Sequence, residues 1–85
     1  MPNDDLIYKI LKKIDNNLTL TEKDEKLMLN CRELDWSFRD FVSIPHSISQ
    51  LDQLQFLNLS GIGLTILPDG ICALPHLTEL VLRDN

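Results

Sequence analysis

Two cysteines and two histidines are the side chains of this 85-residue sequence that have the reactivity to bind a metal or to attack a substrate. Cys31 and Cys72 form no CxxC pair, and no Ser/Cys-His-Asp order or oxyanion motif accompanies them. His46 and His76 have no Cys, Asp or Glu at ligand spacing on a shared rigid element. The pattern indicates surface histidines and predicts no metal site, no disulfide framework and no catalytic nucleophile.

The remaining groups with chemical potential have simpler explanations. Gly61-x-Gly63 lacks the third glycine and the following helix of a phosphate-binding loop, so it predicts a turn. The acidic pairs at 4–5 and 24–25 lie in the first turns of expected helices, where the helix dipole favours negative charge. We therefore expect neither a cofactor nor enzymatic activity.

The composition is typical of one small folded domain, with 44% hydrophobic and 25% charged residues. A net charge of −5 would repel nucleic-acid phosphates and anionic lipids, so neither nucleic acid nor a membrane is an expected partner. The sequence has no apolar run of membrane-spanning length, and its acidic start lacks the features of a secretory signal. The cytoplasm is the expected location, although delivery into another cell remains open.

An internal similarity recurs every 23 residues. The corresponding positions are Cys31, Leu54 and Leu77, then Leu34, Leu57 and Leu80, then Trp36, Leu59 and Leu82. The first two units also share a second half, in which Pro45 matches Pro68, Ile48 matches Ile71 and Leu51 matches Leu74. The agreement in spacing predicts a structural unit that is repeated along the chain.

The segments that begin at Leu54 and Leu77 resemble the LxxLxLxxN core of leucine-rich repeats, and residues 67–74 resemble the LPxxIxxL half of the 23-residue subclass. In that family the Asn side chain bonds backbone groups in the turn after the strand. Asn85 keeps this residue, whereas Arg39 and Ile62 replace it in the earlier units. The resemblance implies protein–protein recognition by the concave strand face, without turnover.

The expected fold is an α/β leucine-rich-repeat solenoid, a right-handed superhelix of about 2.5 repeats with a helical N-terminal cap. Residues 1–30 would form the cap, and residues 31–85 the repeats, in units that start at 31, 54 and 77 with the last incomplete. Short parallel strands should centre on Leu34, Leu57 and Leu80, joined by loose or 3₁₀-like return segments. The residues expected to be buried are Trp36, Leu57, Leu59, Ile71, Leu74 and Leu80.

The N-terminal segment has helical rather than 23-residue periodicity. Its apolar residues between Leu6 and Ile14 share one face of a helix expected over 4–15, and a second helix is expected over about 22–30. Thr21, or the Thr19-x-x-Glu22 capping box, would begin the second helix. We interpret the segment as a cap, and the alternatives are a partner-binding helix and a membrane-surface helix.

The candidate binding site is the concave strand face. Its residues are Glu33, Asp35, Phe56, Asn58, Glu79, Val81 and Arg83, with Ser37 and Ser60 between them. An exposed Phe56 near Val81, flanked by two glutamates, would give an apolar centre with an acidic rim, as in a protein contact. The alternative is that Phe56 only packs against neighbouring strand residues.

The last strand would present an open edge, with Leu77, Leu80 and Leu82 lacking the neighbour that an internal unit supplies. This edge would be covered by more of a longer chain, by a second copy in a homodimer, or by a different protein. The leading hypothesis is a protein-interaction module with a protein partner of unknown identity. The alternative is a substrate-recognition arm or a capping fragment of a larger protein, for example a bacterial effector or ubiquitin ligase.

Overall fold

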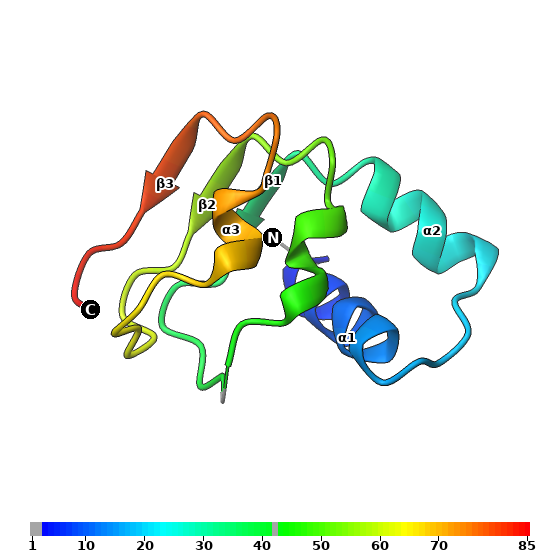
Figure 1. Ribbon diagram of the computed structural model, residues 1–85, viewed down its shortest axis with the longest axis horizontal. Coiled ribbons are helices and arrows are strands. Elements are labelled where there is room, and N and C mark those ends of the chain that lie inside the picture. The colour runs from blue at the N-terminus through cyan, green and yellow to red at the C-terminus, as the bar shows by residue number, and fades with distance from the viewer. Residues whose placement is uncertain (1–2, 42) are drawn as a thin grey trace.

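The computed structural model describes residues 3–41 and 43–85, so the first two residues of the expected cap lie outside the described part. In chain order the elements are α1 (Asp4–Asp15), α2 (Glu22–Leu29), β1 (Glu33–Asp35), the 3₁₀ helix η1 (His46–Gln50), β2 (Phe56–Asn58), α3 (Asp69–Cys72) and β3 (Glu79–Val81). The three strands form one parallel sheet in the order β1-β2-β3 (Figure 1). The predicted strand positions and their parallel pairing are confirmed.

The expectation of a leucine-rich-repeat solenoid is wrong. The chain is a small, compact α/β fold around an open three-stranded sheet, with extents of 35 × 25 × 25 Å. The shape of a solenoid builds up from a small rotation at each of many stacked units. The described residues supply only three strands and two return segments, which are too few to generate a superhelix.

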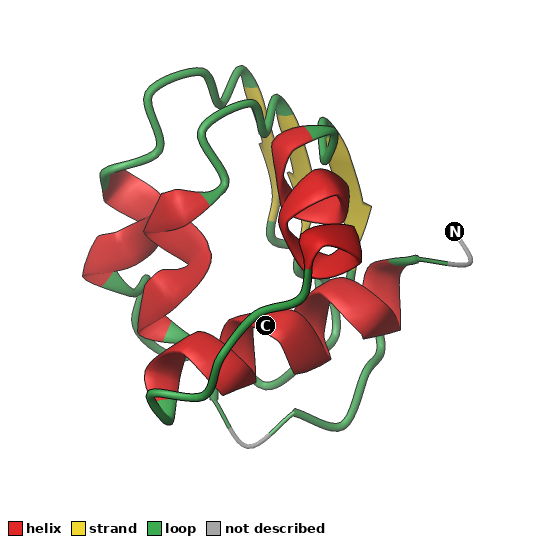
Figure 2. Cartoon of the chain, turned by 90° about the vertical axis from the view of Figure 1, so that its right-hand side faces the viewer, coloured by secondary structure: helices red, strands yellow, loops and turns green. Residues whose placement is uncertain are grey.

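The sheet and the return segments enclose the core from opposite sides (Figure 2). Leu34 and Leu57 lie side by side in the pairing register and are completely buried. Ile48 of η1 and Ile71 of α3 close the core from the other side, and these two short helices pack against each other. Burial is confirmed for five of the six residues for which it was predicted, and Leu80 is the exception because β3 has no described strand on its outer side.

Both N-terminal helices occupy their expected positions, and their apolar periodicity explains why. Ile7, Ile10 and Leu11 of α1 point into the core. The capping box of α2 uses Thr21, whose hydroxyl accepts a hydrogen bond from the Asp24 amide.

Helix α1 connects the sheet to the return segments. Its last residue, Asp15, accepts a hydrogen bond from the Ser47 amide of η1 at 3.1 Å, and the Ser47 hydroxyl donates to the Leu11 carbonyl at 2.8 Å. The other end of α1 contacts β1. The helix therefore sets the position of β1 relative to η1.

Candidate functional site

The outward side chains of the three strands form one surface, which we call the exposed face. The strand register places Phe56 between Glu33 and Glu79, and Asn58 between Asp35 and Val81. These side chains point away from the buried leucines because successive residues of a strand alternate between its two sides. The last residue predicted for this face, Arg83, lies just beyond the end of β3.

The centre of the exposed face is less open than the sequence suggested. Phe56 is half-buried rather than exposed, and Val81 is also half-buried. Glu33 and Glu79 are exposed, and among the described residues neither carboxylate has a hydrogen bond or an ion pair. The face therefore combines a partly accessible aromatic ring with two unpaired carboxylates in the same row.

The polar side chains at the strand ends stabilise the turns that follow. The Asp35 carboxylate accepts hydrogen bonds from the Ser37 hydroxyl at 2.6 Å and from the Ser37 amide at 3.0 Å, and these bonds hold the pKa of Asp35 below its usual range. Asn58 accepts a hydrogen bond from the Ser60 amide at 3.0 Å in the same way. Asp35 and Asn58 therefore have structural roles beside any role in binding.

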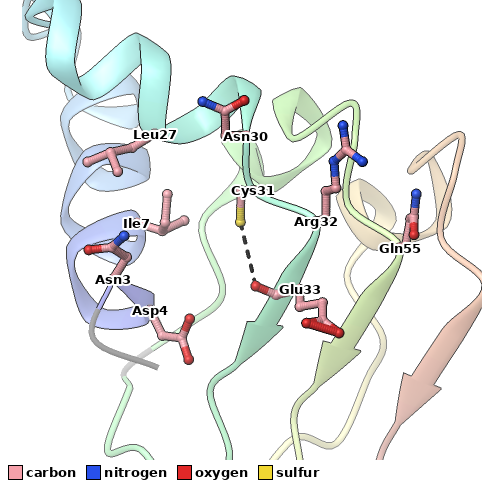
Figure 3. A pocket seen from close by; sticks show the side chains of 9 residues that line it. All are labelled: Asn3, Asp4, Ile7, Leu27, Asn30, Cys31, Arg32, Glu33 and Gln55. Atoms are coloured by element: carbon pink, nitrogen blue, oxygen red, sulfur yellow. Dashed lines mark hydrogen bonds between the residues drawn. The ribbon is translucent and has the colours of Figure 1, made fainter.

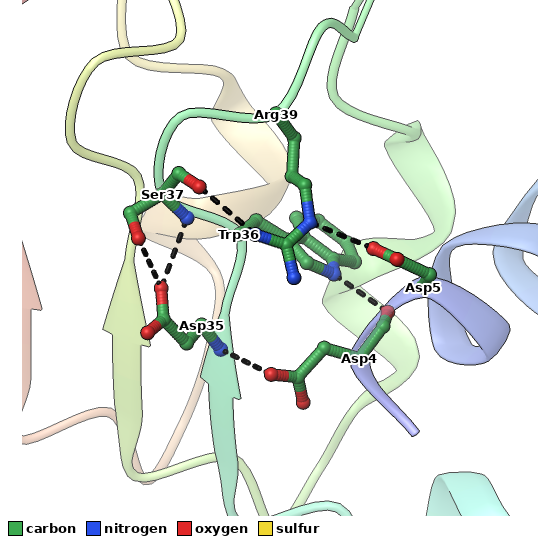
Figure 4. Close-up of polar contacts among 6 residues, drawn as sticks. All are labelled: Asp4, Asp5, Asp35, Trp36, Ser37 and Arg39. Carbon is green, nitrogen blue, oxygen red and sulfur yellow. Dashed lines mark hydrogen bonds and ion pairs between the residues drawn. The ribbon is translucent and has the colours of Figure 1, made fainter. Parts of the chain in front are cut away.

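The outer edge of β1 is closed by the start of α1 (Figure 4). The Asp35 amide donates to the Asp4 carboxylate at 3.3 Å, and the Trp36 indole N–H donates to the Asp4 carbonyl at 2.8 Å. Arg39 and Asp5 form an ion pair at 2.9 Å beside them. These contacts of Asp4 and Asp5 were not predicted, because no local pattern in the sequence links them to residues more than 30 positions away.

Aromatic side chains reinforce the contact between α1 and the chain after β1. Tyr8 and Phe41 stack with their ring centroids 3.9 Å apart, and Trp36 meets both rings edge-on. Trp36 is fully buried, as its place in a leucine position predicted. The cluster has a packing role, since aromatic pairs in this arrangement add to the stabilisation from burial.

An open pocket of about 460 Å³ adjoins the exposed face where α1, α2 and β1 meet (Figure 3). It is lined by Asn3, Asp4, Ile7, Leu27, Asn30, Cys31, Arg32, Glu33 and Gln55. Glu33 belongs to both the pocket and the exposed face, so the two surfaces are continuous. Because these residues come from three separate parts of the chain, 3–7, 27–33 and 55, the sequence carried no local signal for this pocket.

The structure separates the residues that were considered for chemistry. Cys31 is buried, and burial together with the nearby Asp4 charge raises the pKa of its thiol to about 11, which disfavours the nucleophilic thiolate. Cys72 and the two histidines are exposed on other parts of the molecule. No group of three or more potential metal-binding side chains occurs in residues 3–41 and 43–85.

The three leucines predicted for the open edge become more accessible toward the end of the chain. Leu77 and Leu80 are half-buried, and Leu82 is 40% exposed. By contrast Leu59, which precedes Leu82 by one 23-residue interval, is fully buried. The difference arises because β2 has a strand on each side, whereas β3 has a strand on one side only within residues 3–41 and 43–85.

Asn85 makes the turn-stabilising contacts that the sequence resemblance implied for it. Its side-chain oxygen, Oδ1, accepts hydrogen bonds from the backbone amides of Ile62 and Leu64 at 3.2 and 2.8 Å. Its side-chain amide donates to the Leu59 carbonyl at 2.8 Å. One side chain thereby connects the end of the chain to the turn after β2.

A comparison with protein-family models, curated proteins and solved structures finds no match to this chain. In the described part of the chain, no helix has the length and apolar character needed to cross a bilayer. The fold and the site together define a small α/β domain with an exposed sheet face and an adjoining open pocket.

Proposed function

We propose that this chain is a protein-interaction module that binds a partner through the exposed face. The observation that carries the proposal is the row in which the half-buried Phe56 lies between the unpaired carboxylates of Glu33 and Glu79. An aromatic side chain can anchor a partner's apolar side chain, and a charged rim gives specificity and speeds association.

The charge of the face defines the chemistry of the partner. Glu33, Asp35 and Glu79 outnumber the single cation Arg83, and the whole chain carries a net charge of −5. The adjoining pocket adds one carboxylate, Asp4, and one cation, Arg32, so it leaves this acidic balance unchanged. We therefore expect the partner segment to combine an apolar side chain with Lys or Arg residues next to it, and its binding to weaken at high ionic strength.

The proposal involves neither catalysis nor a cofactor. The raised pKa of Cys31 disfavours a nucleophilic role for this buried thiol. The two unpaired cysteines are compatible with a reducing compartment, and we propose the cytoplasm.

A second candidate function is that of a substrate-recognition arm or capping piece within a larger protein. The strand starts at 33, 56 and 79 keep the 23-residue interval, as expected for a unit that is repeated along a longer chain, and the Asn85 side chain connects two successive units by hydrogen bonds. The incompletely covered leucines of β3 favour it as well. This alternative retains binding through the exposed face and differs in what lies beside β3.

Selection from a displayed random-peptide library against the immobilised chain tests the leading proposal. The selected peptides should be enriched in Lys or Arg beside an aromatic or aliphatic residue. Phe56→Ala and Glu33→Lys should each weaken binding of those peptides by about tenfold or more, since hot-spot truncations cost at least 1–2 kcal/mol.

Leu29→Ala is the matched control, because Leu29 is an apolar side chain that is 66% exposed on α2, away from the strands. It should leave peptide binding unchanged. Peptides that bind the Phe56→Ala and Glu33→Lys variants as tightly as the parent would refute the assignment of the binding site to the exposed face.

A further inference from the structure

The two edges of the sheet differ. At β1 the start of α1 covers the edge, since the Asp35 amide donates to the Asp4 carboxylate. Strand β3 pairs with β2 on one side, and no other strand of the described residues lies beyond it (Figure 1). An exposed strand edge is a template for pairing with another strand.

The backbone hydrogen bonds of β3 identify the groups that this edge offers. The Glu79 amide donates to the Gln55 carbonyl at 3.0 Å, and the Val81 carbonyl accepts from the Leu59 amide at 2.8 Å. Peptide groups alternate in direction along a strand, so the N–H and C=O groups of Leu80 and Leu82 point away from β2. The Leu82 carbonyl already accepts one hydrogen bond, from the Asn85 side-chain amide at 3.2 Å, and a carbonyl oxygen can accept a second.

Residues 79–83, which comprise β3 and the two residues after it, are arranged symmetrically about Val81. A leucine lies on each side of Val81, and the two outer residues carry opposite charges. In an antiparallel pair of two β3 strands centred on Val81, Leu80 lies opposite Leu82 of the second copy and Glu79 lies opposite its Arg83. The outward peptide groups of Leu80 and Leu82 then form a hydrogen-bonded pair. The ion pair between Glu79 and Arg83 of the other copy occurs twice by symmetry, and opposite charges across two strands stabilise a register.

We propose that β3 pairs antiparallel with β3 of a second copy of this chain, about a two-fold axis through Val81. A two-fold axis perpendicular to the sheet keeps the leucines of both copies on one side and joins the two sheets into one of six strands. Leu82, which is 40% exposed in the single chain, gains the neighbour that Leu59 has within it.

Neighbouring registers are less favourable. With the axis at Leu80, Glu79 lies opposite Val81 and the carboxylate has no cation across from it. With the axis at Leu82, Leu80 lies opposite Asp84, so an apolar side chain meets a charged one. Charge complementarity therefore selects the axis at Val81. The pairing does not require a partner on the exposed face, although it uses Glu79, Val81 and Arg83 of that face and pairs the Glu79 carboxylate with Arg83 of the second copy.

Sedimentation equilibrium of the full chain, over a concentration series in the micromolar range, tests the pairing. The parent should change from monomer to dimer with rising concentration. Glu79→Arg and Arg83→Glu should each raise the dimer dissociation constant by about tenfold, since each variant sets like charges opposite each other twice. Their double variant, and an equimolar mixture of the two single variants, should restore dimerisation.

Glu33→Arg is the matched control, because Glu33 occupies the position of Glu79 on the covered strand β1. It should leave the dissociation constant unchanged. Circular dichroism of every variant checks that it is folded.

Amide hydrogen exchange gives a second readout that needs no substitution. The amides of Leu80 and Leu82 should exchange more slowly as the dimer forms, whereas the Glu79 amide, already bonded to Gln55, should not change. A parent that stays monomeric throughout, or a dimer that the charge swap fails to restore, would overturn the proposal. The first result would leave the edge to a different chain, and the second would place self-association elsewhere.

Discussion

Replacing Leu57 by alanine should strongly destabilise the domain, because this residue is at the centre of the sheet. Its side chain is fully buried and lies between Leu34 and Leu80 in the strand register. The substitution removes three carbon atoms, and at roughly 0.8 kcal/mol for each the lost transfer free energy is about 2.4 kcal/mol. The cavity left behind brings the expected loss to about 3–4 kcal/mol, within the range of about 2–5 for such changes.

This loss is large compared with the total stability of a domain of this size, which is roughly 4–13 kcal/mol at the usual value per residue. Urea denaturation followed by the fluorescence of Trp36, which is the single tryptophan and is fully buried, measures the change directly. Leu57→Val is the milder variant if Leu57→Ala does not fold, with an expected loss of about 1 kcal/mol.

Leu29→Ala provides the control for the same chemical change at a site that is 66% exposed, and it should shift stability by less than about 0.5 kcal/mol. The slope of the denaturation curve should stay the same in all variants. A Leu57→Ala midpoint no lower than that of Leu29→Ala would show that the strand register and the core assignment are incorrect.

Three further predictions concern a carboxylate, the two thiols and a glycine. Hydrogen bonds to Thr21 in the capping box and to Lys13 lower the pKa of Asp24, so its stabilising effect is present above the unfolded pKa near 4 and is lost as the pH falls below that value. Asp24→Asn should be less stable than the parent in urea at pH 7, and equal stability of the two proteins there would contradict this. In labelling with an aromatic disulfide at pH 8, the exposed Cys72 should react quickly, whereas the buried Cys31, whose pKa is about 11, should react only as the chain unfolds. Cys72→Ser should therefore remove the fast phase of labelling, and rapid labelling of that variant would show that Cys31 is accessible. Gly61 has a φ of +66°, and an added Cβ would lie 2.3 Å from the Phe38 ring, so Gly61→Ala should lower stability by about 1–2 kcal/mol in urea denaturation. Part of this loss should remain in a Phe38→Ala background, because removing the ring relieves the clash but not the strain of a positive φ at alanine.

Local patterns in the sequence determined the positions of the regular elements. The 23-residue interval located all three strands, because the same alternation of leucines recurs at each. The apolar face of residues 4–15 defined the bounds of α1. Of the two predicted starts of α2, Thr21 is confirmed, whereas the capping box forms between Thr21 and Asp24 and not between Thr19 and Glu22. Each of these signals lies within a few residues of the element that it specifies, so a single sequence is enough to find it.

Tertiary structure alone decided how these elements meet. The docking of α1 on β1 joins Asp4 to Asp35 and Trp36, and the adjoining pocket collects residues from three segments. It also decided the overall shape, a compact domain instead of a solenoid, and the partial exposure of Leu80 in a leucine position that is buried in the two earlier strands. The physical reason is that burial and long-range hydrogen bonding depend on which neighbours pack around a residue in space. The periodicity of a sequence indicates the face on which a side chain lies, but not what covers that face.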